Sequence, residues 1–213
     1  LLVVTLFSVS AAAEGEEQKV YYKAAFGNIF EYTVENGEAT IVGATIEKGD
    51  VIIPNELGGY PVKKIGEKAF YDEYKIKSIF IQSGIEEIGE KAFQGCMYLT
   101  DIELPRNTTK IGNYAFSNCE GMKTVTFEKN SILGNIQDGA FEACFLLEEI
   151  KIPASVITIY PCAFRACISL ERVEFEQGSR LERIYSEGFA YCESLEEIEL
   201  PSTLTTIGAN AFK

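Results

Sequence analysis

Six cysteines are the side chains best suited to chemistry in this sequence, because it contains no histidine. Without histidine, the chain lacks the usual general base of serine and cysteine hydrolases and the imidazole ligands of most catalytic zinc sites. Five cysteines recur at one position of a regular pattern, which is typical of a packing position, and we expect them to be buried free thiols. These are Cys96, Cys119, Cys144, Cys167 and Cys192. Cys162 stands outside the pattern and is predicted to be an accessible thiol; no Cys-x-x-Cys pair indicates a metal site.

Acidic residues dominate the charge of the chain. The chain contains 32 Asp and Glu residues and 19 Lys and Arg residues, so its formal net charge is −13. A nucleic acid or an anionic membrane surface requires a basic footprint, and the composition argues against both as partners. Carboxylate pairs are abundant, but neither a deep pocket nor a glycine-rich phosphate loop is expected. The sequence therefore predicts no enzymatic activity, no metal and no cofactor.

An internal repeat supplies the elements that must position these side chains. Ala-Phe, or Gly-Phe once, recurs with gaps of 23, 23, 25, 23, 25 and 23 residues. An Ile lies five residues before each of these Phe residues. One of the five recurring cysteines lies three residues after most of them. The Phe positions are Phe70, Phe93, Phe116, Phe141, Phe164, Phe189 and Phe212.

Each repeat also contains a short stretch that alternates between apolar and polar residues, such as Leu99 to Leu104. A unit of about 23 residues with an L-x-x-I-x-L stretch is typical of a leucine-rich repeat solenoid, in which each turn adds one strand. We therefore predict an α/β solenoid: a right-handed coil with a parallel β-sheet on its concave face and short helical turns on the return side. The Phe positions should stack inside it. The two longer units have two extra residues after the strand, where Asn130 and Gly178 suit a wider turn.

The outward positions of the strands form the candidate binding surface, because side chains alternate along a strand and concave solenoid faces commonly bind partners. Arg172 is expected to lie between Glu149 and Glu197 on neighbouring strands, and Lys151 beside Glu174. Phe80 is the one predicted aromatic anchor. The candidate binding residues are Phe80, Asp101, Glu103, Thr126, Glu149, Lys151, Arg172, Glu174, Glu197 and Glu199.

Three segments divide the chain. Residues 1–13 are apolar, uncharged and end in small residues, which indicates part of a secretory signal peptide. Residues 14–64 are expected to form an N-terminal β cap, with a hairpin around Asn36-Gly37. Residues 65–213 contain six full repeats and a truncated seventh, so we expect more of the protein to follow in the gene.

The repeat I-G-x-x-A-F-x-x-C-x-x-L-x-x-I-x-L-P, clearest from Ile88 to Pro105, resembles the leucine-rich repeats of the BspA-like family. The resemblance implies a secreted or surface-displayed solenoid, associated in some members with adhesion to host or bacterial proteins, and it transfers no catalytic residue. We interpret the chain as a non-enzymatic, secreted or cell-surface module that binds an extracellular protein, without membrane insertion of the mature chain. The alternative is a passive stalk or targeting arm of a larger surface enzyme whose catalytic domain lies beyond Lys213. The oligomeric state is left open.

Overall fold

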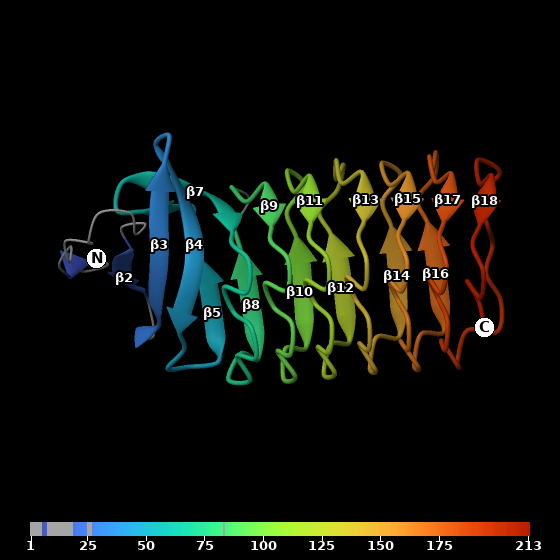
Figure 1. Ribbon diagram of the computed structural model, residues 1–213, viewed down its shortest axis with the longest axis horizontal. Coiled ribbons are helices and arrows are strands. Elements are labelled where there is room, and N and C mark those ends of the chain that lie inside the picture. Colours follow the sequence, from blue (N-terminus) through green and yellow to red (C-terminus); the bar gives the residue numbers. More distant parts are fainter. Residues whose placement is uncertain (1–5, 8–18, 25–26, 83) are drawn as a thin grey trace.

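The computed structural model describes residues 6–7, 19–24, 27–82 and 84–213. The chain coils as a right-handed β-solenoid whose turns follow one another along a single axis from the N-terminal to the C-terminal end (Figure 1). The expected signal peptide lies largely outside the described residues, although Leu6–Phe7 within it form β1, which pairs antiparallel with β2 (Val20–Lys23).

Antiparallel strands begin the fold. Asn36 and Gly37 have φ angles of 51° and 81°, as a two-residue hairpin turn with positive φ at both positions requires. The predicted hairpin is therefore confirmed. Its second strand then runs parallel to β7, which connects the hairpin to the coils. These strands are β2 (Val20–Lys23), β3 (Ile29–Glu35), β4 (Glu38–Thr45), β6 (Glu56–Leu57) and β7 (Tyr60–Ile65).

Two rows of parallel strands run along the solenoid (Figure 1). The first row contains the predicted four-residue strands: β5 (Asp50–Ile53), β8 (Ser78–Ile81), β10 (Asp101–Leu104), β12 (Thr124–Phe127), β14 (Glu149–Ile152) and β16 (Arg172–Phe175). The second row continues from β7 with two-residue strands, which the repeat pattern did not predict. They are β9 (Glu87–Ile88), β11 (Lys110–Ile111), β13 (Asn135–Ile136), β15 (Thr158–Ile159), β17 (Arg183–Ile184) and β18 (Thr206–Ile207).

Neither row is one continuous sheet, which corrects the prediction of a single parallel sheet. The long strands divide into β5-β8 and β10-β12-β14-β16. The short strands divide between β11 and β13, where the first 25-residue unit inserts its two extra residues ahead of β13. Residues 195–200, expected to supply a further long strand, are not a strand.

The predicted helical turns are wrong, because the described residues contain no α-helix. Lys91, Tyr114 and their counterparts on other coils have φ near +55°, a conformation that ends a right-handed helix. Backbone N–H groups on the return side also alternate between two kinds of acceptor. The Phe93 N–H donates to Ala115 O on the next coil over 2.7 Å, whereas the Ala92 N–H donates to Gly89 O within its own turn over 3.3 Å. The return side is thus a ladder of turns joined coil to coil.

The phenylalanine column forms the centre of the core. Successive rings from Phe70 to Phe212 stack nearly parallel, with centroids 4.9 to 5.6 Å apart. Phe30 from the hairpin meets the first ring, Phe70, edge-on at 6.3 Å. The prediction that these residues stack one above another is confirmed, and the hairpin covers the first ring of the column.

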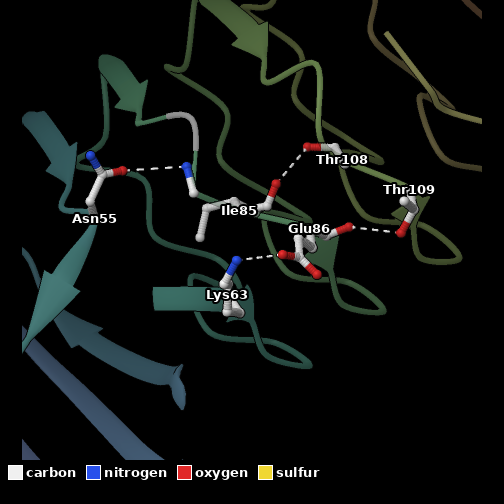
Figure 2. A network of polar contacts seen from close by, with 7 residues as sticks. Asn55, Lys63, Ile85, Glu86, Thr108 and Thr109 are labelled. Carbon is white, nitrogen blue, oxygen red and sulfur yellow. Dashed lines mark hydrogen bonds and ion pairs between the residues drawn. The ribbon is translucent and has the colours of Figure 1, made fainter. Parts of the chain in front are cut away.

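Polar contacts fix the corner where long strands lead into short ones (Figure 2). Thr108 Oγ1 donates to Ile85 O over 3.2 Å, and Thr109 Oγ1 donates to Glu86 O over 3.1 Å, so two hydroxyls bond to the coil before them. Lys63 in turn pairs with the Glu86 carboxylate. Two carbonyl groups at this corner thereby gain partners from the neighbouring coil.

Candidate functional site on the strand face

The strand face consists of the outward side chains of the six long strands. Along β10 and β14, exposed and buried residues alternate, so Asp101, Glu103, Glu149 and Lys151 face solvent while the apolar residues between them enter the core. The alternation places most of the predicted site residues on one surface.

In one column of the strand face, each carboxylate contacts a hydroxyl or a guanidinium group on the next strand. Ser78 Oγ donates to Asp50 Oδ1 over 2.7 Å, and Thr124 Oγ1 donates to Asp101 Oδ1. Hydrogen bonds from Thr124 and Thr100 lower the pKa of the Asp101 carboxyl. Asp101 is therefore a partnered acceptor within the sheet as well as a surface charge.

A groove of about 360 Å³ opens in this face between β12 and β14. The two strands pair only at Thr124 with Glu149 and at Val125 with Ile150, whereas β10 pairs with β12 over all four residues. The 25-residue unit explains the separation, because its wider turn follows β12 directly. Asn130 and Gly178, the residues expected to suit the two wider turns, have φ angles of 63° and 81°.

Five predicted site residues meet at this groove. Its polar wall includes Thr126, Glu149, Lys151, Arg172 and Glu174. Val125, Ile150 and the half-buried Phe127 contribute apolar surface to the lining. The arrangement offers carboxylates, cations, a hydroxyl and apolar surface within one hollow, which suits recognition of a polar protein segment.

The ion pairs in the groove differ in part from those predicted. Arg172 bonds Glu149 at 3.2 Å as expected, but its second partner is Glu174 on its own strand at 3.6 Å rather than Glu197. Lys151 lies 4.0 Å from Glu174, as predicted. Because these side chains are half exposed or more, each pair contributes little to stability.

The remaining predicted residues lie elsewhere. Asp101 and Glu103 are on β10, and Phe80 on β8 is 56% exposed, beside Ile52 on β5. Sequence reasoning missed Ile52, although the Val-Ile-Ile-Pro stretch that contains it resembles a repeat strand. Glu197 and Glu199 are exposed on a segment without strand structure, which corrects their predicted placement on the sheet.

A second hollow follows the second 25-residue unit. It has a volume of about 720 Å³ and is lined by Glu174, Phe175, Gly178 and Glu199, among others. Phe175 is half buried, like Phe127 in the first wide unit. Each two-residue insertion is thus accompanied by a hollow at the edge of a long strand.

The cysteine column is structural. All six cysteines are free, as predicted, and each of the five column thiols donates to the carbonyl of a phenylalanine on the preceding coil; Cys119 Sγ, for example, lies 3.2 Å from Phe93 O. Burial raises the pKa of Cys96 and of Cys192 to about 12. Cys162 is partly exposed, and burial also raises its pKa.

The described part of the chain contains no group of three or more His, Cys, Asp or Glu side chains arranged to hold a metal ion. Over the same residues, no helix is long and apolar enough to cross a membrane.

The coiled strands, the stacked phenylalanines and the exposed strand face define a leucine-rich repeat solenoid. The family model described as a BspA type leucine-rich repeat region, in six copies, matches residues 63–175 and 134–213. The chain therefore belongs to the BspA-type leucine-rich repeat family. Among curated proteins, none matches the chain.

Solved structures of bacterial leucine-rich proteins share the fold. A leucine-rich cell surface protein of Faecalibacterium prausnitzii is 27% identical with a TM-score of 0.70, covering 91% of this chain and 52% of that one. A leucine-rich repeat protein of Eubacterium ventriosum is 23% identical with a TM-score of 0.76, covering 94% and 50%. The pneumococcal vaccine antigen PcpA is 25% identical with a TM-score of 0.53, covering 91% and 47%. The chain thus spans about half the length of these proteins, and none of these matches indicates an enzymatic family.

Proposed function

We propose that this chain is a non-enzymatic, secreted or cell-surface module that binds an extracellular protein through its strand face. The groove between β12 and β14 supports the proposal, because five of the ten residues selected from sequence meet there. The match to a leucine-rich cell surface protein supports the location. An open hollow lined by paired charges and apolar side chains is suited to a protein segment.

The charge of the surface points to a basic or polar partner. The outward residues of the long strands include Asp50, Asp101, Glu103, Glu149 and Glu174 against two cations, Lys151 and Arg172. Complementary charge steers association and is screened over about 8 to 10 Å at ordinary salt. Binding should therefore weaken as the salt concentration rises.

Charge reversal in the groove tests this function. The purified chain is expected to bind at least one of immobilised fibronectin, laminin and collagen, measured by surface plasmon resonance. Glu174→Lys would place a third cation beside Lys151 and Arg172, and we expect it to weaken binding roughly tenfold. Glu193→Lys makes the same charge change away from the groove and should leave affinity near its original value. Equal losses in both variants, or binding to none of the three proteins, would contradict the proposal.

A further inference from the structure

A separate hollow lies at the edge where the return side turns toward the long strands. It has a volume of about 310 Å³ and spans three successive coils. Tyr71 and Tyr74 come from the first coil, Met97 from the second and Glu120 from the third. Tyr74, Met97 and Glu120 occupy the same position of the repeat, four residues after the core phenylalanine. This edge hollow is distinct from the groove on the strand face, with which it shares no lining residue.

Gly95 leaves room for the Asp72 carboxylate at the edge hollow. The residues two positions after the core phenylalanines from Phe70 to Phe189 form a column with positive φ, and Gly95 in this column has a φ of 78°. A Cβ at this position would collide with the Asp72 carboxylate of the preceding coil. Ala143 and Ala166 occupy the same column farther along with φ of 58° and 59°, so the backbone there accepts alanine.

Aromatic and sulfur-containing side chains stand open to solvent around this space. Tyr71 is 45% exposed, Tyr74 59% and Met97 41%. Large apolar side chains gathered at a hollow mark an interaction surface, whereas single exposed ones are ordinary. Tyrosine rings also attract cations placed over their faces within about 6 Å.

The charge of the edge hollow has one sign. Its two charged lining residues are Asp72 and Glu120, and neither forms an ion pair within the part of the chain that the structure describes. In the strand-face groove, by contrast, Glu149 and Glu174 form ion pairs with Arg172 and Lys151. The edge hollow therefore combines aromatic surface with uncompensated negative charge.

We propose that the edge hollow receives the cationic side chain of an arginine or lysine in a basic segment of a partner protein. The side chain would place its charged head between the Asp72 and Glu120 carboxylates, and the methylene stem against Tyr74 and Met97. The inference is independent of the strand face and stands whether or not the groove binds a partner.

NMR spectra of the backbone amides can test this proposal directly, because Gly95 lines the edge hollow. The full chain, labelled with ¹⁵N, is titrated with N-acetyl-arginine amide, and separately with N-acetyl-citrulline amide, a neutral molecule of similar shape. We expect the Gly95 and Asn118 amide signals to shift and saturate with the arginine compound but not with the citrulline compound. Identical shifts with both compounds, or none with arginine, would overturn the proposal.

Matched variants separate local recognition from general attraction to an acidic protein. Glu120→Gln and Glu193→Gln each remove one charge at the same repeat position, three coils apart, and we expect only the first to weaken binding. Equal weakening would show attraction to the overall charge and contradict the site. Gly95→Ala would displace the Asp72 carboxylate from the edge hollow, on a backbone conformation that Ala143 and Ala166 also adopt. We expect it to abolish the saturable shift at Asn118; retained saturation would count against the site.

Variants of Tyr74 test whether its aromatic ring contributes to binding the arginine compound. Tyr74→Leu preserves the net charge, and we expect the dissociation constant for the arginine compound to rise about two- to fivefold. Tyr74→Phe keeps the ring and should restore the affinity, which distinguishes a lost ring from a disturbed fold. Tyr60→Leu removes another exposed tyrosine, on β7 away from the edge hollow, and should leave the dissociation constant unchanged. An unchanged dissociation constant for Tyr74→Leu would remove the tyrosine from the proposal.

Discussion

At the scale of single residues, the phenylalanine column determines stability. Phe141 is fully buried between the rings of Phe116 and Phe164, each 5.4 Å away. We expect Phe141→Ala to lower the free energy of unfolding by about 3 to 5 kcal/mol, because it removes a ring from a stack and leaves a cavity. Phe80→Ala, on the exposed face, should stay within about 0.5 kcal/mol. Chemical denaturation of both variants checks this, and similar losses would show that the column has no special role.

Cysteine reactivity should follow burial and thiol pKa. The thiolate is the form that alkylates, and the raised pKa of the column thiols keeps them protonated near neutral pH. With iodoacetamide at about pH 8, we expect Cys162 to react first and the five column cysteines only after unfolding in concentrated guanidinium chloride. Mass spectrometry of peptides from native and unfolded samples measures the order, and early labelling of Cys119 or Cys144 would be incompatible with it.

Glu87 should contribute to the loss of folding stability as the pH becomes acidic. Burial alone raises the pKa of this carboxyl, but hydrogen bonds from Lys110 at 2.7 Å and from Lys64, whose Nζ lies 3.2 Å away, outweigh it, and the net pKa is lowered. A pKa below the unfolded value of about 4.3 means that the stabilisation is present above that pH and is lost as the pH falls through the folded pKa. Thermal melts of Glu87→Gln from neutral pH to pH 3 should therefore show a shallower decline than the unmodified chain. Glu67→Gln, an exposed control, should retain the original slope; two identical curves would exclude Glu87 as the cause.

At the scale of elements, the length of the turn after a long strand controls whether the next strand pairs fully. β12 and β14 separate after two residue pairs because nine residues, rather than seven, lead from Phe127 to the Ile of the following short strand. The insertion that breaks the regular period also opens the groove. The proposed site is therefore a product of the irregular units and not of the consensus repeat.

Deleting Lys129 and Asn130 should close the groove. Both residues are exposed, and their loss converts the unit to the 23-residue length, so we expect β12 and β14 to pair over all four residues. A crystal structure of the variant would show the closure, and binding through the groove should be lost with it. Deleting Gln177 and Gly178 from the second wide unit is the matched control and should leave the first groove open. A groove that persists in the first variant would mean that the turn length does not determine it.

At the scale of the whole molecule, the hairpin and the coils share one core through Phe30. Its ring meets Phe70 edge-on, so the hairpin covers the end of the stack. Phe30→Ala is expected to cost about 3 to 5 kcal/mol and to lower hydrogen-exchange protection first at the Phe70 amide, which bonds Ala92 O. Because coils contact mainly their neighbours, the Phe141 amide should be affected less. Equal loss of protection at both amides would indicate that the array unfolds only as a unit.

The repeat period allowed the stacked core and the outward residues to be predicted, because one column of Phe, Ile and Cys repeats in every unit. Three features could not be read from it. The two-residue strands carry too little alternation to be distinguished from a turn, and the positive φ of Lys91 or Tyr114 is invisible in residue types that also form helices. The partner of Arg172 depended on whether residues 195–200 pair as a strand, which the alternating pattern alone did not decide.

The spacing of about 5 Å between stacked rings has a further consequence for how such a molecule can change. Duplicating one coil inserts a single step along the axis and leaves the contacts within every other coil as they were. The distance between two surface features, such as the strand-face groove and the edge hollow, can therefore be lengthened in fixed increments by gene duplication. The size of each increment is the spacing between neighbouring rings of the phenylalanine column.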